Sequence, residues 1–372
     1  MRLAVLMLLV MALSQGATSI PSRPRARDLG IAPGTMAPGP FNAITDVPGV
    51  LVGHTTIVAG ANVRTGVTAV LPHGGNLFRE KVPGAVFVGN AFGKLAGSTQ
   101  VEELGTIESP IVLTNTLSVG MAIDAVVRWS IAQPGNETVR SVNAVVGETN
   151  DGSLNDIRGL HVGREHVASA IAGARTGAVE EGAVGAGTGT VAFGWKGGIG
   201  TSSRRVGQQN DVWTVGVLVQ SNYGGRLVID GIPVWKTLSP SPRGNPGPTA
   251  DGSCMVVVAT DAPLDARDLK RLAARAIFAL ARTGSTYSNG SGDFAIAFST
   301  HPSLRVSGAS GPQPRIILPT DSLSELFEAA LDATEEAIYN SLLKATDTTG
   351  NGQTIRAVPL DRLKELFAKH GR

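Results

Sequence analysis

The sequence predicts a layered α/β protein in which helices pack on the outer faces of β-sheets. Two observations predict it. Short apolar runs of strand length alternate with glycine-rich turns through the first part of the chain, and amphipathic patterns with a period of 3.6 residues stand out towards its end. With 372 residues, 42% of them hydrophobic, the chain is long enough to bury a sizeable core.

The first residues are typical of a secretory signal peptide. Arg2 provides a positive charge, residues 3–13 are apolar, and small residues follow up to Ser19. Because about 20 apolar residues are needed to span a bilayer, we expect residues 1–19 to be cleaved off rather than to remain as an anchor. The mature protein is therefore expected to be periplasmic or secreted. Residues 20–40, rich in Pro, Gly and Arg, predict an extended arm on the surface.

Further along the chain, the apolar patterns predict the individual elements. Asp265 is placed to cap a helix whose apolar residues recur with helical spacing as far as Gly284. Ser322 and Glu325 form a capping box ahead of a second helix. Strands are predicted where short apolar runs are bounded by turn residues, at 67–71, 85–88, 111–113, 142–146, 212–219, 255–260 and 294–298.

The step from Gly252 to Ser253 is the most informative local feature. It joins a Pro-, Gly- and Ser-rich loop, 238–251, to the predicted strand at 255–260. If this peptide bond is cut, Ser253 carries both a hydroxyl and an α-amine. The reference pKa of such an amine, about 7.7–8.0, lets it accept the hydroxyl proton near neutral pH. This is the chemistry of an N-terminal-nucleophile hydrolase. A Gly-Ser pair on its own is more often a loop that enters a core strand, so the neighbouring residues decide.

Several other classes of site lack their motifs. His161 and His166 are five residues apart, which does not place them on one helix face, and the single cysteine, Cys254, can form neither a zinc ribbon nor an internal disulfide. No complete nucleotide-binding glycine motif and no G-x-S-x-G elbow occur. A formal net charge of +2 without a basic, aromatic cluster argues against a nucleic-acid partner. We expect no metal and no cofactor.

A set of collinear segments carries a resemblance to a known family. These segments are 25–30, 42–47, 53–54, 64–72, 113–116, 118–120, 151–156, 197–201, 216–220, 252–253 and 289–292. Together they resemble the peptidase family that includes L-aminopeptidase D-amidase/esterase and the β-peptidyl aminopeptidases. The similarity covers nearly all of the mature chain, from about residue 25 to the C-terminus.

This resemblance implies a fold and an activation step. The fold is a four-layer αββα sandwich, like that of the N-terminal-nucleophile hydrolases but with distinct connectivity. Autocleavage between Gly252 and Ser253 divides the mature protein into an α chain, 20–252, and a β chain, 253–372, which remain one structural domain. The protomers assemble, typically as a tetramer of αβ heterodimers. The implied activity is the release of N-terminal residues from short peptides, amides and esters.

The resemblance also assigns roles to matching residues. It implies that Ser253 is the nucleophile and its liberated amine the base, and that Asn222 stabilises the oxyanion. Ser291 corresponds to a serine that bonds the nucleophilic residue, and Glu148 to a carboxylate that holds the substrate's ammonium group. These positions suit their roles, because Glu148 and Asn222 both follow predicted strands. Read alone, Asn222, Ser291 and Asp293 are more often turn residues than catalytic ones, and Glu148 is as often a solvated strand end.

Two residues depart from the family pattern. Asp293 stands where glutamate is usual, which keeps the charge but shortens the side chain by one methylene. Asn150 replaces a tyrosine that assists the oxyanion site, and an amide still donates a hydrogen bond. Cys254, adjacent to the nucleophile, is expected to be a small buried hydrophobe.

Two alternative functions remain open. The first is an acyltransferase similar to ornithine acetyltransferase, in which the nucleophile is usually threonine rather than serine. The second is a binding protein that keeps the scaffold with little catalysis, which the departures at Asn150 and Asp293 leave possible. The sequence does not fix the preference between α- and β-amino acids.

Overall fold

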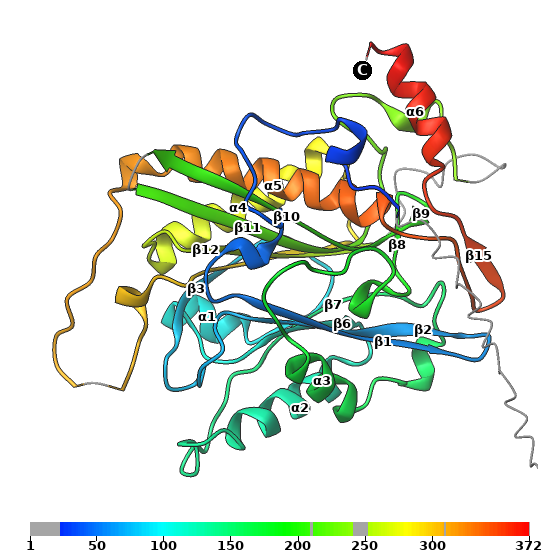
Figure 1. Cartoon of the computed structure of the whole chain (residues 1–372). Coiled ribbons are helices and arrows are strands. Elements are labelled where there is room, and N and C mark those ends of the chain that lie inside the picture. The colour runs from blue at the N-terminus through cyan, green and yellow to red at the C-terminus, as the bar shows by residue number, and fades with distance from the viewer. Residues whose placement is uncertain (1–22, 209–210, 241–251, 309, 372) are drawn as a thin grey trace, which may run out of the picture.

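Two β-sheets stacked face to face form the middle of the molecule, and helices cover the outer face of each (Figure 1). The computed structural model describes residues 23–208, 211–240, 252–308 and 310–371. The expected signal peptide, 1–19, and most of the predicted loop at 238–251 lie outside the described residues. The arrangement is the predicted four-layer αββα sandwich, which confirms the fold class.

The larger sheet contains the strand that begins at Ser253. Its order is β10 (Gly198–Gln208), β11 (Asp211–Asn222), β12 (Ser253–Thr260), β13 (Gly292–Ser299), β3 (Val82–Ala91) and β5 (Thr106–Ile107). β12 pairs antiparallel with β11 and parallel with β13. Because β11 precedes residue 252 and the other two strands follow it, the segments on both sides of the proposed cleavage point share one sheet.

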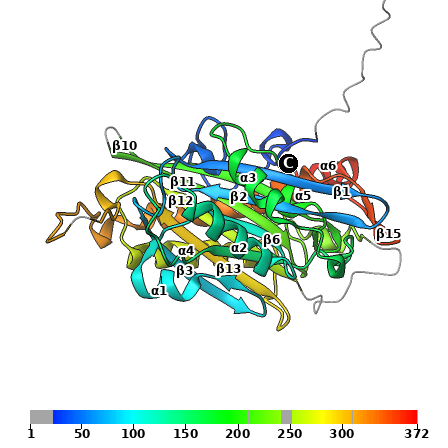
Figure 2. The ribbon, with the colours of Figure 1, turned by 90° about the horizontal axis from the view of Figure 1, so that it is seen from below.

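The smaller sheet has five strands in the order β1 (Leu51–Ala59), β2 (Val63–Leu71), β6 (Ile111–Asn115), β7 (Val145–Thr149) and β4 (Leu95–Ala96). On its outer face, α3 (Arg164–Ala172) packs against β1 and β2, and α2 (Val119–Ile131) against β6 and β7. Figure 2 shows these two helices in front of the sheet.

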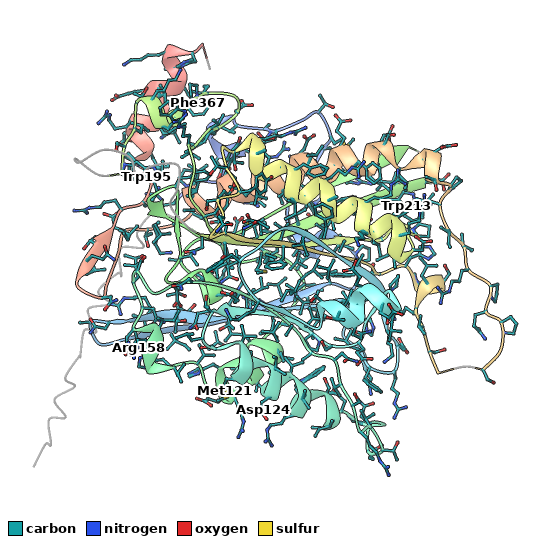
Figure 3. All side chains as sticks on the ribbon, turned by 180° about the vertical axis from the view of Figure 1, so that it is seen from behind. Met121, Asp124, Arg158, Trp195, Trp213 and Phe367 are labelled. Carbon is teal, nitrogen blue, oxygen red and sulfur yellow. The ribbon has the colours of Figure 1, made fainter. Side chains whose placement is uncertain are left out.

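The outer face of the larger sheet is covered by α4 (Ala266–Arg282) and α5 (Ser324–Leu343). α1 (Ser98–Leu104) lies against β3, and α6 (Leu360–Lys369) follows α5 in the chain. Two short hairpins complete the fold: β8 (Val191–Ala192) with β9 (Trp195–Lys196), and β14 (Thr348–Gly350) with β15 (Gln353–Ile355). Trp195 and Phe367 of α6 belong to the same apolar cluster (Figure 3). No described helix combines the length and hydropathy of a membrane-spanning segment.

Three apolar cores lie between the four layers, and strand alternation assigns β12 to two of them. Cys254, Val256 and Val258 face the α4/α5 layer, whereas Met255 and Val257 face the smaller sheet. A strand whose two faces are both buried reads as a continuous apolar run, which is why the sequence predicted it. The third core lies between the smaller sheet and α2 with α3.

Most predicted elements are confirmed, with shifted bounds. Asp265 caps α4 as expected, because its carboxylate accepts a hydrogen bond from the N–H of Asp268. The predicted strand at 142–146 starts later, at Val145.

The capping box at Ser322 is wrong. Ser322 belongs to a short 3-10 turn, Thr320–Ser322, while α5 begins at Ser324 with Leu323 at its N-cap and without a side-chain cap. Leu323 is buried in the core beside α5, so apolar packing rather than a polar cap sets the start of this helix.

The N-terminal arm is not confined to the surface. Ala26 and Ile31 are buried in the core beneath α5, and a 3-10 turn, Arg27–Leu29, lies between them. Arg27 forms an ion pair with the fully buried Glu336 of α5. Since this carboxylate needs cationic partners once it leaves water, the arm is drawn against the helix.

Candidate active site

A cavity of about 660 Å³ opens at the start of β12, between the ends of the two sheets. Its lining includes Ser253, Gly252 and Asn222 from the larger sheet and its connections, and Glu148 and Asn150 from the end of β7. The structure therefore brings most of the predicted site residues together.

The close approach of the two sheets explains how Glu148 comes near Ser253. Gly147, the residue before Glu148, faces Met255 of β12. A β-carbon at position 147 would lie 2.8 Å from the Met255 sulfur, closer than van der Waals contact allows. A side chain at position 147 would have to displace the buried Met255 side chain or move β7 away from β12.

Ser253 is paired across both neighbouring strands. Its register partners are Asn222 on β11 and Gly292 on β13. The N–H of Gly292 donates to the carbonyl oxygen of Gly252 at 3.0 Å and lies 3.3 Å from the Ser253 Oγ. One backbone donor thus contacts both the hydroxyl and the carbonyl that a self-cleavage reaction would join.

Asn222 is held by a backbone group. Its Oδ1 accepts a hydrogen bond of 2.9 Å from the N–H of Val191, the first residue of β8. A backbone N–H can pair only with the amide oxygen, so this contact fixes which way the side chain is turned. The NH₂ end of Asn222, a hydrogen-bond donor, is left for the cavity that the residue lines.

Asp293 lies on the opposite face of the sheet from the Ser253 hydroxyl. Its register partner is Cys254, and its side chain is fully buried. The Ser291 hydroxyl donates to Asp293 Oδ1 at 2.9 Å, while Oδ2 has no hydrogen-bond partner. Burial raises the pKa of Asp293 to about 6, partly offset by the Ser291 hydroxyl and the Cys254 N–H. Asp293 is thus placed beside the backbone of residues 253–254 rather than beside the Ser253 hydroxyl.

Ser291 contacts Asp293, and its predicted bond to the nucleophilic residue is absent from the contacts of the uncut chain. Cys254 is completely buried, as expected. Burial, with Asp293 nearby, raises the pKa of its thiol well above its usual range. A neutral thiol facing a core is a poor nucleophile.

Glu148 is a buried carboxylate that faces the cavity. Its side chain is 2% exposed. The N–H of Lys94 donates to Oε1 at 3.0 Å, and the Thr116 hydroxyl donates to Oε2. The Lys94 ammonium lies 3.8 Å from Oε1 on a side chain that is 57% exposed. The backbone and Thr116 therefore fix the carboxylate, and its only cationic neighbour among these contacts is loosely held at the mouth of the cavity.

Asn150 is the exposed member of the set. Its Oδ1 accepts from the N–H of Gly152, which fixes the amide within its own loop. Sequence reasoning did not single out Lys94, Val191 or Gly292. Lys94 and Val191 act through backbone groups, which leave no trace in residue type, and Gly292 was part of a quoted segment without a role. Thr116 likewise lay inside a quoted segment.

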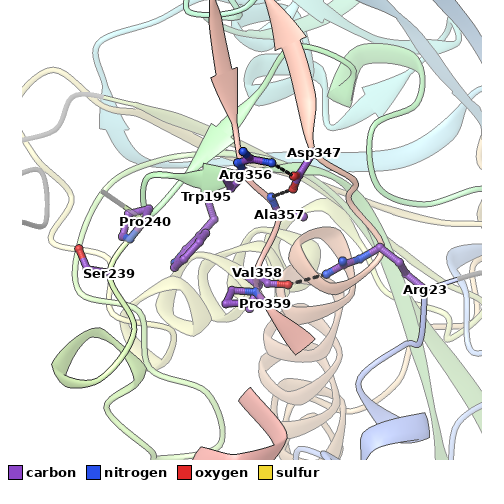
Figure 4. A pocket seen from close by; sticks show the side chains of 9 residues that line it. All are labelled: Arg23, Trp195, Ser239, Pro240, Asp347, Arg356, Ala357, Val358 and Pro359. Carbon is purple, nitrogen blue, oxygen red and sulfur yellow. Dashed lines mark hydrogen bonds and ion pairs between the residues drawn. The ribbon is translucent and has the colours of Figure 1, made fainter. Parts of the chain in front are cut away.

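A second cavity of about 800 Å³ lies away from this cluster (Figure 4). Its charged groups are engaged in structural contacts: Arg356 pairs with Asp347, and Arg23 donates to the carbonyl oxygen of Val358. The first contact closes the base of the β14–β15 hairpin, and the second ties the N-terminal arm to the segment that follows the hairpin.

Comparison with known proteins identifies the family of this chain. The model of peptidase family S58 matches residues 42–355. The beta-peptidyl aminopeptidase BapA of Sphingosinicella microcystinivorans is 44% identical over 375 residues, covering 94% of this chain and 93% of that protein. BapA of Sphingosinicella xenopeptidilytica is 40% identical over 388 residues, covering 98% and 96% respectively.

The solved structures agree. The L-aminopeptidase D-Ala-esterase/amidase of Ochrobactrum anthropi, a prototype of the serine aminopeptidases and a new variant of the Ntn hydrolase fold, superposes with a TM-score of 0.87 at 37% identity. The match covers 94% of this chain and 99% of that one. The four-layer fold is thus a variant of the Ntn hydrolase fold. The chain belongs to peptidase family S58, and its activity is that of an aminopeptidase.

Proposed function

We propose that this protein is a self-activating serine aminopeptidase. Cleavage between Gly252 and Ser253 yields the chains 20–252 and 253–372, and Ser253 then acts as an N-terminal nucleophile. The observation that carries the proposal is the position of Ser253: it begins a buried strand, lines the cavity, and is flanked by Asn222 and Gly292.

The contacts of the uncut chain support self-cleavage. The Ser253 hydroxyl attacks the carbonyl carbon of Gly252, whose oxygen already accepts from the Gly292 N–H. As the C–N bond breaks, the nitrogen of Ser253 takes the hydroxyl proton, and Gly252 becomes esterified to the hydroxyl. Water hydrolyses this ester, which leaves a Gly252 carboxylate and a Ser253 with free hydroxyl and free amine.

Turnover repeats the same attack on an external carbonyl. The α-amine of Ser253 accepts the hydroxyl proton and delivers it to the leaving nitrogen or oxygen as that bond breaks. Water, activated by the same amine, then hydrolyses the acyl-enzyme. The Asn222 NH₂ and the Gly292 N–H, released when Gly252 departs, are the donors for the developing oxyanion. One such donor is worth roughly 2.7–4 kcal/mol in acyl-transfer enzymes.

Asp293 provides a partner for the new amine. Its buried Oδ2 has no partner within hydrogen-bond geometry, although the Cys254 N–H lies near enough to the carboxylate to lower its pKa. An ammonium group there would fill the unmet acceptor, at the cost of raising the amine's pKa. In this role the shorter aspartate side chain suffices because its carboxylate already lies next to the backbone.

Glu148 gives the enzyme its preference for free N-termini. A buried carboxylate facing the cavity binds a substrate ammonium through a charge-assisted hydrogen bond. The substrates are thus short peptides, amides and esters with a free amino group. Because the two BapA relatives are beta-peptidyl aminopeptidases, β-amino acids are included among the N-terminal residues released. We further propose that the enzyme is exported and assembles as a tetramer of αβ protomers.

Two variants of adjacent residues test the nucleophile. Ser253→Ala should remain one chain and show no turnover of aminoacyl anilides. Cys254→Ala, the matched control, should process normally and keep its activity. Processing or turnover by Ser253→Ala, or their loss in Cys254→Ala alone, would contradict the proposal. A panel of L-α-, D-α- and β-aminoacyl anilides measures the preference, and incubation with acetylornithine and glutamate detects acyl transfer.

A further inference from the structure

The orientation of Asn222 depends on a single peptide group. The Asn222 Oδ1 accepts from the N–H of Val191, and this contact turns the NH₂ towards the cavity. If that N–H moved, the amide would lose the contact that distinguishes its two ends. The position of the Val191 N–H therefore determines whether Asn222 presents its NH₂ group to the cavity.

The other end of the same peptide group is bound by a buried ammonium. Lys196 of β9 donates to the carbonyl oxygen of Thr190 at 3.0 Å, and the N–H of Gly197 donates to the same oxygen at 3.1 Å. The Thr190 carbonyl and the Val191 N–H belong to one planar trans peptide, so they point in opposite directions. Lys196 and the Gly197 N–H thus hold one end of this rigid unit, and Asn222 binds the other, with Lys196 as the only charged partner among these three.

The remaining protons of Lys196 fix the loop around this peptide. Its ammonium also donates to the carbonyl oxygens of Gly187 at 2.8 Å and Gly197 at 2.9 Å. A lysine ammonium has three donors, and all three are used here. The segment from Gly187 to Gly197 is therefore gathered around one side chain, which is completely buried.

A fully buried ammonium is expensive to maintain in a fold. Lysine is almost never fully buried, and a well-packed apolar side chain would avoid the loss of hydration. Burial lowers the pKa of Lys196 to about 7, while the nearby Asp151 raises it. The lowered pKa of Lys196 reflects the loss of hydration on burial. Lys196 lies next to the peptide that holds Asn222, and this position indicates a role for its charge.

We propose that Lys196 is a positioning residue for the oxyanion donor, acting on Asn222 through the Thr190–Val191 peptide. The inference rests on the proposed function of Asn222. Lys196 fixes the plane of the peptide. Its positive charge at the carbonyl end also polarises the N–H, and through it the Asn222 amide, because hydrogen bonds in a chain strengthen one another. Lys196 touches neither the substrate nor Ser253 in this scheme.

A double-mutant cycle tests the inference. Lys196→Met keeps much of the volume and removes all three donors. Its kcat for an aminoacyl anilide should fall about tenfold or more, with KM within about twofold of the wild type. Asn222→Ala should lower kcat by about 100-fold to 1,000-fold, the effect of one oxyanion donor. In the Asn222→Ala background, Lys196→Met should change kcat by less than about twofold, since the residue it orients is gone.

Several outcomes overturn the inference. A purely structural lysine would lower kcat by the same factor with and without Asn222, or would change KM instead. Lys364→Met on α6, an exposed lysine, is the matched control and should match the wild type. Thermal unfolding of each variant identifies those that are folded.

If Lys196→Met does not fold, the same cycle is run with Lys196→Gln, whose amide retains two donors. Lys196→Gln should keep more activity than the Met variant wherever both fold, and equal losses count against the inference. Failure of the proposed function gives a different result: Asn222→Ala would then keep the kcat of the wild type. A slow Asn222→Ala with an additive Lys196 effect rejects only the role of Lys196.

Discussion

The N–H of Gly292 donates a hydrogen bond of 3.0 Å to the carbonyl oxygen of Gly252, the carbonyl directly before Ser253. This contact is the first rung of the parallel ladder between β12 and β13. The peptide bond that we expect to be cut is thereby held at the start of a central strand, with its carbonyl polarised. The same contact explains why a strand must begin at Ser253 for this chemistry to occur.

Gly252→Ala should block processing. A β-carbon at this position would lie 2.4 Å from both the Asn222 carbonyl oxygen and the Tyr223 Cα, so the backbone must move. The carbonyl would then leave the Gly292 N–H, and we expect cleavage to slow by at least about tenfold, the equivalent of about 1.4 kcal/mol. A time course on denaturing gels measures this. Gly120→Ala, where a β-carbon meets open space, is the control and should be processed normally.

Glu148→Gln should raise KM for substrates with a free amino group by about fivefold or more. The amide retains an acceptor oxygen but loses the charge, and a hydrogen bond to a charged group is worth about 1 kcal/mol more than a neutral one. Initial rates with an aminoacyl anilide measure KM and kcat. Glu103→Gln on α1, an exposed carboxylate, is the control. A KM within twofold of the wild type would show that Glu148 does not bind the ammonium.

Asp293→Asn should shift the acid limb of the kcat/KM profile to lower pH. A neighbouring carboxylate favours the ammonium form of the Ser253 amine and raises its pKa, so its removal lowers that pKa, by about one unit. The profile of the processed enzyme between pH 5 and 9 measures the shift. Asp321→Asn, an exposed residue ahead of α5, should leave the profile unchanged. A shift to higher pH would mean that Asp293 does not face the amine.

The uncut Ser253→Ala protein should be least stable near pH 6–7. Burial raises the pKa of Asp293 from 3.8 to about 6. The folded state then binds more protons than the unfolded state in this range, and the free energy of unfolding falls as pH rises from about 4 to about 6. Burial lowers the pKa of Lys196 from 10.5 to about 7. The folded state binds fewer protons there, so the free energy of unfolding rises with pH above about 7.

Urea midpoints at a series of pH values measure this dependence. Asp151, whose pKa burial also raises to about 6, adds to the falling limb, and His54, whose pKa burial lowers to about 4, offsets part of it. In the Ser253→Ala background, Lys196→Met should remove the rise above pH 7, and Asp293→Asn should flatten the fall below pH 6. A monotonic increase from pH 4 to pH 9 in the parent would be inconsistent with these burial effects.

How far the sequence predicts the fold depends on whether a pattern is local. The apolar run of β12 and the spacing of α4 with its Asp265 cap are local, and both elements occur. The start of α5 is not local, because the burial of Leu323 against distant residues overrides the polar signal of Ser322. The arm around Ala26 looked exposed by composition, yet a buried carboxylate on α5, over 300 residues away, holds it.

The candidate site likewise contains residues that the sequence predicts and others that it does not. The resemblance picked out Ser253, Asn222 and Glu148, and the structure places them on one cavity. Apart from the Thr116 hydroxyl, the groups that orient them are backbone donors at Lys94, Val191 and Gly292, which any residue except proline supplies. The sequence does not predict the burial of Lys196, because lysine is almost never fully buried in proteins. Its role is visible only once the Thr190–Val191 peptide is seen between it and Asn222.

Intact-mass spectrometry of the active enzyme tests the central claim most directly. The account predicts two chains, the shorter one corresponding to residues 253–372 with an unmodified serine at its N-terminus, and turnover that grows in proportion to the cleaved fraction. Full turnover from a preparation whose only mass is that of the continuous chain would contradict it.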